Sequence, residues 1–213
     1  MGKLMLRISG AGMALLLSAS IAWSETAPAK TVVFLGDSLS AGFGVKTAEA
    51  FPALIAEKIR EANLPYEVEN AGVSGDTTAG GLRRIDWLLQ RPIDVLVIEL
   101  GANDGLRGLP VAAIKSNLQK IIDKTKSKNR GVKVVIAGMQ MPPNLGGDYA
   151  SSFQRAFGEV AQANDATLIP FLLEGVGGMR ELNQPDSIHP TAAGHRIIAD
   201  VIWRTLEPIL RQQ

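Results

Sequence analysis

The chain has 213 residues, with 22 Lys and Arg against 21 Asp and Glu, which gives a formal net charge of +1. Hydrophobic residues make up 46% of the chain, so the composition fits a globular protein with a sizeable core and excludes a disordered one. The balanced charge gives no reason to expect nucleic acid as a partner. Because the sequence has no cysteine, disulfides, thiolate metal sites and a thiol nucleophile are excluded.

The N-terminal segment has the features of an export signal. A positive start at Lys3 and Arg7 precedes an apolar run over residues 8–22, and small residues follow at the two positions that a signal peptidase inspects. An uncleaved anchor is the alternative, but the run is shorter than the roughly 18–20 residues of a spanning helix. We expect residues 1–24 to be a signal peptide and residues 25–213 to form one domain. The mature protein would be periplasmic or secreted, without stable membrane insertion.

Short apolar runs alternate with amphipathic segments along the rest of the chain. Runs rich in Val, Ile and Leu predict strands at Thr31–Leu35, Tyr66–Asn70, Asp94–Leu100, Lys133–Met139 and Ala166–Phe171. Helices are predicted near Thr47–Ala62, Thr77–Gln90, Pro110–Lys128, Tyr149–Asn164 and Thr191–Arg211, with Thr47 and Thr191 as N-caps. This alternation predicts an α/β fold with a parallel sheet covered by helices on both faces, in three layers. Five strands suggest the flavodoxin-like order 2-1-3-4-5.

The last predicted helix has apolar residues at helical spacing. Ala193, Ile197, Val201 and Ile202 are expected to face the sheet. His195 lies in the same stretch, and we interpret it as a packed or surface residue of the helix and not as a catalytic base.

Ser38 stands directly after the first predicted strand, in the sequence Gly36-Asp37-Ser38-Leu39. In open parallel sheets, chemistry occurs at the carboxyl ends of the strands. The N-terminus of a following helix would favour a product that is an oxyanion. The segment is not a G-x-S-x-G nucleophile elbow, since Ser40 takes the place of the second glycine. A helix cap or turn residue is the alternative role for this serine.

Asp186 precedes His189 by three residues, just before the last predicted helix. At this spacing a carboxylate can reach the Nδ1–H of the imidazole and leave Nε2 free to take a proton, as in a catalytic triad. The alternative is a helix cap with an incidental histidine. Two further loops carry donors: the Asn103 amide could donate to a developing negative charge, and Gly75 could present a bare backbone N–H. A turn alone would also explain the segment that contains Asn103.

Taken together, these segments resemble the GDSL/SGNH hydrolase family. Gly36-Asp37-Ser38-Leu39 matches its first block, Gly75 its second, Gly101–Asp104 its third and Asp186-x-x-His189 its last. The longer strings LGDSLSAG, VSGDT, ELGANDGLRG and DSIHP look like the branch of exported bacterial thioesterases, lysophospholipases and arylesterases.

The resemblance implies a role for each matching residue. Ser38 would be the nucleophile, His189 the base and Asp186 the group that orients the base. The oxyanion would be held by the backbone N–H groups of Ser38 and Gly75 and by the Asn103 side chain. The resemblance also implies a serine hydrolase of acyl esters or thioesters that forms an acyl-enzyme and needs no metal or cofactor.

Apolar side chains near two loops suggest a groove for an acyl chain. Candidates for substrate binding are Met141, Pro142, Leu145, Tyr149 and Met179. Ordinary packing beneath the loops is the alternative. A small-molecule acyl ester or thioester is the expected partner, and nothing in the sequence demands more than a monomer.

Two other functions were weighed against the hydrolase. A metal-dependent phosphatase could use Asp37, Asp186 and His189 as ligands, but no H-E-x-x-H motif or compact acidic cluster is present. A nucleotide-binding module is the other rival. The segment Gly42–Thr47 fits neither G-x-x-x-x-G-K-[ST] nor G-x-G-x-x-G, which disfavours it.

Overall fold

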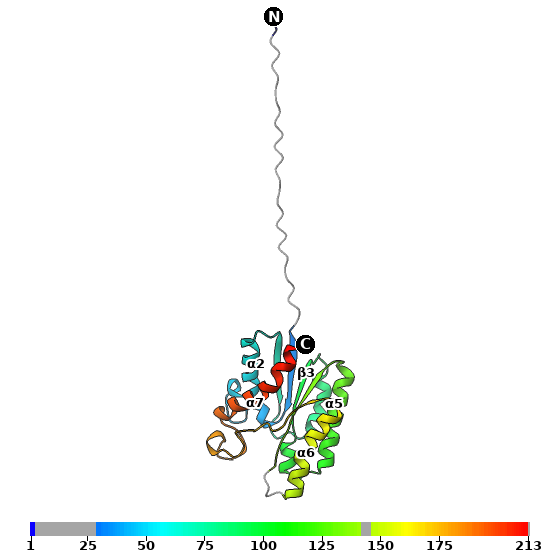
Figure 1. The fold of residues 1–213 in the computed structure, drawn as a ribbon, viewed down its shortest axis with the longest axis vertical. Coiled ribbons are helices and arrows are strands. Elements are labelled where there is room, and N and C mark those ends of the chain that lie inside the picture. Colours follow the sequence, from blue (N-terminus) through cyan, green and yellow to red (C-terminus); the bar gives the residue numbers. More distant parts are fainter. Residues whose placement is uncertain (3–28, 142–145, 213) are drawn as a thin grey trace.

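The structure is a computed structural model that describes residues 1–2, 29–141 and 146–212. Its centre is a five-stranded parallel sheet in the order β2-β1-β3-β4-β5 (Figure 1). The strands are β1 Lys30–Gly36, β2 Tyr66–Gly72, β3 Val95–Glu99, β4 Lys133–Ala137 and β5 Thr167–Ile169. The predicted α/β class and strand order are confirmed. Most of the predicted signal peptide, from residue 3 onward, lies outside the described residues.

Helices cover both faces of this sheet. Figure 1 shows α2 and α7 on one side of β3, with α5 and α6 on the other; α2 contacts α7, and α5 contacts both α3 and α6. These helices are α2 Phe51–Glu61, α3 Thr78–Leu88, α5 Val111–Lys128, α6 Gly147–Ala163 and α7 Ala192–Arg211. Short helical turns occur at α1 Ser38–Ala41, η1 Thr47–Glu49, α4 Ala102–Leu106 and η3 Arg180–Leu182. Among the described residues, no helix combines the length and apolarity that crossing a bilayer requires.

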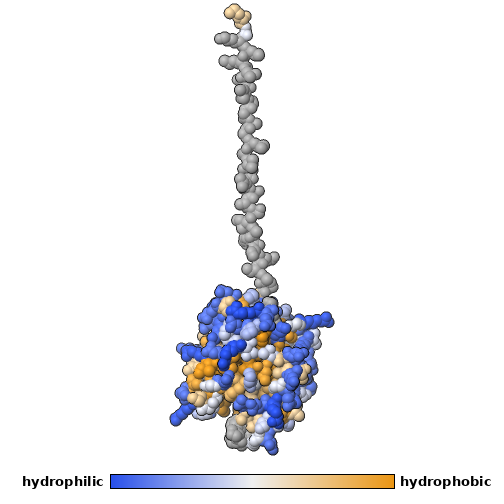
Figure 2. Space-filling model, viewed as in Figure 1, coloured by the Kyte–Doolittle hydropathy of each residue, from blue (hydrophilic) through white to orange (hydrophobic). Residues whose placement is uncertain are grey.

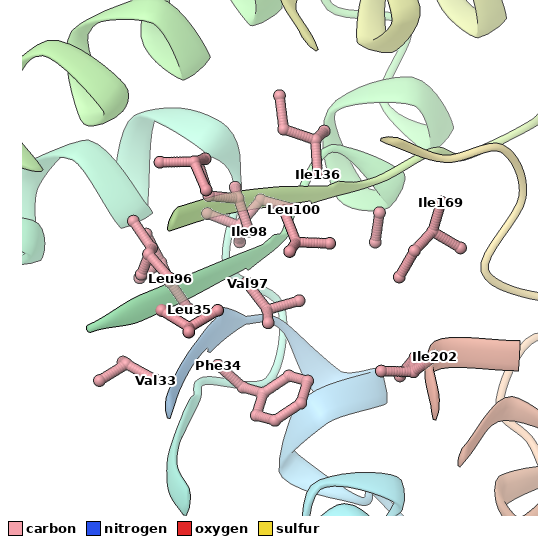
Figure 3. Packing of buried hydrophobic residues seen from close by; sticks show 14 of the residues in the cluster. Val33, Phe34, Leu35, Leu96, Val97, Ile98, Leu100, Ile136, Ile169 and Ile202 are labelled. Carbon is pink, nitrogen blue, oxygen red and sulfur yellow. The ribbon is translucent and has the colours of Figure 1, made fainter. Parts of the chain in front are cut away.

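The core lies between the sheet and its two helical layers. Every residue of β3 is buried, as expected for a central parallel strand that is covered on both faces. The side chains of Phe34 in β1 and Ile202 in α7 lie on the same side of the sheet (Figure 3). The Phe34 ring packs edge-on against the Phe51 ring of α2, with ring centroids 5.6 Å apart. Figure 2 shows the charged and polar residues gathered around the edges of the molecule, with apolar residues towards the middle of this face. The packed sheet is therefore a rigid platform for the loops at its carboxyl edge.

The prediction that Thr47 caps the second helix is wrong. Thr47–Glu49 forms a separate 3-10 turn, and α2 begins at Phe51 after the extended residue Ala50. Pro52 gives the reason, because proline has no N–H and is tolerated only in the first turn of a helix. A helix that began at Thr47 would place this proline in its second turn.

Of the four residues expected to face the sheet from α7, Ala193 does not, and Ile197 packs against the core only in part. Thr191 caps the helix as predicted, accepting from Gly194 N–H at 3.3 Å, and Val201 and Ile202 are buried. Ala193 is exposed and Ile197 only half-buried, whereas Gly194 and His195 are buried. The buried face is rotated because η3 passes close to the start of α7. A Cβ atom on Gly194 would lie 2.5 Å from the Leu182 carbonyl oxygen, so this glycine has to face the neighbouring chain.

Candidate active site

Ser38 begins the single-turn helix α1 directly after β1. The Asp37 side chain caps this turn by accepting from the Leu39 N–H at 3.0 Å, and Gly42 ends it in a left-handed conformation. Ser38 is buried apart from a small exposed fraction and lines a cavity at the carboxyl edge of the sheet. The sharp passage from strand to helix therefore presents the Ser38 hydroxyl at the sheet edge, where the sequence predicted it.

The loop before α7 holds Asp186 and His189 in a compact turn. One carboxylate oxygen of Asp186 accepts from the backbone N–H groups of Ile188 and His189, at 2.9 and 3.0 Å. The other oxygen lies 2.7 Å from His189 Nδ1. These hydrogen bonds stabilise the charged form and lower the pKa of Asp186 to about 2. The bonds from His189 have the largest effect. The carboxylate is therefore ionised at any working pH and faces the imidazole.

The imidazole of His189 bridges this loop to the serine. Its Nε2 lies 3.0 Å from Ser38 Oγ, although the two residues are 151 positions apart in the chain. The Phe43 ring packs against the same imidazole, with ring centroids 4.5 Å apart. Sequence reasoning missed Phe43, because a single aromatic residue in a glycine-rich loop carries no periodic signal. The structure thus brings Ser38, His189 and Asp186 together in one hydrogen-bonded series.

Asn103 stands beside the serine at the start of α4. Its side-chain amide donates to the Asp37 carboxylate at 3.0 Å, which leaves the second amide N–H for another acceptor. Burial raises the pKa of Asp37 to about 6, against the opposing effect of its bonds from Leu39 and Asn103. Asn103 lines the cavity with Ser38.

Gly75 lies on the loop after β2 and is not among the residues that line the cavity. It has a φ of +79°, which suits glycine, and its carbonyl accepts from Arg107 at 3.1 Å. The loop is held at its far end by buried Asp104, which accepts from the N–H and the hydroxyl of Thr78 at 2.8 and 2.6 Å. In the described part of the chain no acceptor is found for the N–H of Ser38 or of Gly75.

The cavity beside Ser38 has a volume of about 630 Å³ and a mostly apolar wall. It is lined by Asp37, Ser38, Leu39, Ala102, Asn103, Leu106, Met139, Gln140, Met141, Phe171, Leu173, Gly177, Gly178, Ser187, Ile188 and His189. Of the residues predicted to bind substrate, Met141 is in this wall, whereas Pro142 and Leu145 lie outside the described residues. Met141 is therefore the one of these three residues that the structure places beside Ser38.

Tyr149 and Met179 are not part of the cavity wall. The Tyr149 hydroxyl donates to the Leu109 carbonyl at 2.8 Å and its ring stacks on Phe153, so it packs α6 against the loop before α5. Met179 is 45% exposed. Leu106, at the end of α4, and Ile188, in the loop before α7, do line the wall, but each is an apolar residue between polar or glycine neighbours and gives no periodic signal in the sequence.

A hydroxyl, an imidazole and a carboxylate in hydrogen-bonded series at the edge of an α/β sheet are characteristic of serine hydrolases as a class. The particular family is given by comparison with known proteins. Residues 34–197 match the GDSL-like Lipase/Acylhydrolase family, and the chain belongs to it. It is therefore an ester-hydrolysing enzyme.

Individual relatives cover most of the chain. The chain is 42% identical over 202 residues to "Esterase TesA" of Pseudomonas aeruginosa. This alignment covers 92% of this chain and 99% of the relative. It is 38% identical to an "Arylesterase" of Vibrio mimicus, covering 82% of this chain and 87% of that one. The Escherichia coli "Thioesterase 1/protease 1/lysophospholipase L1" is 36% identical, and the alignment covers 87% of this chain and 88% of that relative. A crystal structure of TesA superposes with a TM-score of 0.81 at 41% identity, over 84% of this chain and 99% of that one.

Proposed function

We propose that this protein is a serine esterase in which Ser38 is the nucleophile, His189 the general base and Asp186 the group that orients the base. The observation that carries the proposal is the continuous series of contacts, 3.0 Å from Ser38 Oγ to His189 Nε2 and 2.7 Å from His189 Nδ1 to Asp186. These distances are within reach of proton transfer. The ionised Asp186 holds the tautomer that leaves Nε2 free to accept the serine proton.

The reaction has two halves. In the first, His189 takes the Ser38 proton while Oγ attacks the acyl carbonyl, and the imidazolium then gives this proton to the departing alcohol or thiol. The acyl group remains on Ser38 as an ester. In the second half, His189 takes a proton from water as the water oxygen attacks the acyl carbonyl, the bond to Ser38 Oγ breaks to release the acid, and the imidazolium returns the proton to Oγ.

Three donors are proposed to stabilise the oxyanion of each tetrahedral intermediate. They are the backbone N–H groups of Ser38 and Gly75 and the side-chain amide of Asn103. The support for this role is that neither N–H has an acceptor within the described residues, and that Asn103 has an amide N–H beyond the one bonded to Asp37. Donors fixed in advance at the site of developing charge lower the barrier without reorganisation during the reaction.

The substrates are proposed to be acyl esters or thioesters with a medium-length acyl chain on a small or polar leaving group. The mostly apolar cavity beside Ser38 supports this choice, since an apolar pocket binds a hydrocarbon chain. The names of the relatives, an esterase, an arylesterase and a thioesterase/lysophospholipase, agree with it. A chain-length series of p-nitrophenyl esters should give the highest kcat/KM at intermediate length. Activity on the acetate alone would contradict the proposal.

The nucleophile and base are tested by substitution. Ser38→Ala and His189→Ala should each lower kcat by about 10³-fold or more, because each removes a group that takes part in both halves of the reaction. Ser127→Ala, at an exposed serine in α5, is the matched control and should retain full activity. A serine-directed phosphonate should label the wild type and the control but not Ser38→Ala. Normal turnover by Ser38→Ala would refute the mechanism.

The metal-dependent alternative is disfavoured by the position of Asp37. Its carboxylate is fully buried and already accepts from Leu39 N–H and from Asn103, so it does not reach out to a metal with Asp186 and His189. Ester hydrolysis should therefore be unchanged after treatment with a chelator. Loss of activity that zinc or magnesium restores would support the rival.

Export is proposed from the N-terminal sequence. Residues 1–24 would act as a cleaved signal peptide, which delivers residues 25–213 to the periplasm or the exterior as a monomeric enzyme. Expression of the full chain should yield a mature protein whose N-terminus, read by mass spectrometry, lies at or near Glu25. A full-length product in the cytoplasm would contradict this.

A further inference from the structure

Glu99, the last residue of β3, lies beneath the turn that carries Ser38. It has no exposed surface. Its Oε2 accepts from the backbone N–H of Asp37 at 3.2 Å, from that of Ser40 at 3.0 Å and from the Ser40 hydroxyl at 2.6 Å. The two residues bonded to this one oxygen stand on either side of Ser38. Glu99 therefore fixes the nucleophile turn from below without touching the cavity.

The chain is shaped around this contact at Gly36. A Cβ atom on Gly36 would lie 2.0 Å from Ser40 Oγ and 2.6 Å from Glu99 Oε2, both far inside normal contact distance. The first glycine of the Gly-Asp-Ser segment thus leaves room for the carboxyl group of Glu99 and the hydroxyl that it holds. This explains a residue that the proposed mechanism does not otherwise use.

Asp37, the second carboxyl group at this place, is buried as completely as Glu99. Across the described residues, no ion pair reaches either carboxyl group. Arg84 binds the Gly36 carbonyl at 2.8 Å, but its guanidinium is paired with Asp76. The titratable group that faces the pair from the loop before α7 is His189, whose electrostatic effect lowers the pKa of Asp37.

Two adjacent carboxylates that are buried without a cation cannot both be ionised at moderate cost. Asp37 has donors on both of its oxygens, from Leu39 and from Asn103. Glu99 has three donors on Oε2, whereas its Oε1 is buried and has no partner among the residues that the structure describes. An oxygen that carries negative charge but receives no hydrogen bond is costly, so a proton belongs on Oε1. Burial and the charge of Asp37 also raise the pKa of Glu99 well above its ordinary value.

We propose that Glu99 is a positioning residue that works in its protonated form. It fixes the turn on both sides of Ser38, and it leaves a single negative charge on Asp37, which orients the Asn103 amide. A second charge beneath the Ser38 N–H would oppose the oxyanion that forms there, and this gives the neutral state of Glu99 a function. The proposal rests on the proposed roles of Ser38 and Asn103 in ester hydrolysis.

Three variants test the positioning role. Glu99→Gln keeps an acceptor for the three donors, is neutral at every pH and should retain kcat within about threefold at neutral pH. Glu99→Leu removes the acceptor and should lower kcat by about 10²-fold or more at little change in KM. Glu67→Gln, at an exposed position of β2, is the control and should behave as the wild type. If kcat of Glu99→Gln falls as far as kcat of Glu99→Leu, the neutral form of Glu99 is not the form that supports catalysis, and the proposal is wrong.

The protonation state has its own readout, which does not depend on folding of the leucine variant. At neutral pH the infrared spectrum of the wild type should contain a protonated-carboxyl C=O band that is missing from Glu99→Gln and retained in Glu67→Gln. A wild-type spectrum without this band would overturn the proposal.

The infrared measurement also separates this proposal from the proposed function. In a Ser38→Ala background the band should persist, because Glu99 is held by the backbone of the turn and not by the Ser38 hydroxyl. If Ser38→Ala kept full activity, the proposed mechanism would fail while the band could still be present. If the band were absent while Ser38→Ala was inactive, only the role of Glu99 would fail.

Discussion

The two sides of the candidate active site are held in different ways. On the nucleophile side, Asp37 has no exposed surface, and its partners Glu99 and Asn103 lie more than sixty positions away. On the base side, the Asp186 side chain is 38% exposed, and its three hydrogen bonds reach no further than residue 189. The nucleophile is positioned by the fold, and the orientation of the base by a short stretch of sequence.

This difference separates activity from stability. A change on the base side breaks contacts that water can replace, so it should alter catalysis and leave the fold intact. A change on the nucleophile side leaves buried polar groups without partners or forces atoms apart, so it should lower both activity and stability. The four predictions that follow test this contrast, from the largest expected effect to the smallest.

The base side is tested by Asp186→Asn. The amide can still accept from the Ile188 and His189 N–H groups, but its NH2 group cannot accept from His189 Nδ1–H, which disturbs the tautomer needed at Nε2. We expect kcat to fall by about 10²–10⁴-fold. The free energy of unfolding, measured in urea, should change by less than about 1 kcal/mol, because the site is exposed. A loss of stability as large as that from a change under Ser38 would contradict the contrast.

The nucleophile side is tested first by Asn103→Ala. Loss of the amide should lower kcat by about 10²–10³-fold if Asn103 is an oxyanion donor. Because the Asp37 carboxylate also loses a buried partner, unfolding should become easier by about 1 kcal/mol or more. Ester kinetics and urea unfolding of the same preparation measure both effects. Normal turnover by a folded variant would remove Asn103 from the proposed role.

A methyl group at Gly36 tests the packing under the nucleophile turn. Gly36→Ala forces Ser40 and Glu99 apart and should destabilise the protein by about 1–3 kcal/mol, with a fall in kcat as the turn shifts. The matched control is Gly147→Ala at the start of α6, where a Cβ atom meets no atom of the described residues within 4 Å. The control should change stability by less than about 0.5 kcal/mol. Equal effects at both glycines would show that the contact under Ser38 is not tight.

A second histidine extends the comparison to pH. His195 is buried in α7, its Nδ1 accepts from Phe51 N–H at 3.2 Å, and its Nε2 has no partner within the described residues. Burial lowers the pKa of His195 to about 4. Above pH ~6.5 the ring is neutral in both the folded and the unfolded chain. As the pH falls from there towards 4, only the unfolded chain takes up the proton, so folding stability decreases.

Urea unfolding at pH 7 and pH 4 measures this effect. The wild type should lose about 1–3 kcal/mol more than His195→Gln across this range, since the glutamine cannot titrate. If His195→Gln declined as steeply as the wild type, burial of this ring would not explain any acid sensitivity.

Much of the fold was predictable from the sequence because its signals are local. Runs such as Val95–Glu99 are apolar throughout, which is the pattern of a strand buried on both faces, and they alternate with amphipathic segments. Of the two errors, one has a local cause and the other depends on a distant segment. The start of α2 depends on Pro52 within one turn, but the buried face of α7 is set by η3 passing over Gly194, which helical periodicity cannot reveal.

The sequence by itself determined the strand order, the glycine-rich loops at one edge of the sheet, and the Asp186–His189 turn, because these depend on neighbouring residues or on general rules of chain topology. Only the tertiary structure decided that His189 lies within 3.0 Å of a serine 151 positions away, that Phe43 packs on its ring, and that Glu99 is enclosed beneath the nucleophile. The physical reason is that burial and long-range contact are properties of the packed molecule. In the sequence, a glutamate at the end of an apolar strand looks like an exposed polar residue, and only the folded structure shows that a turn covers it.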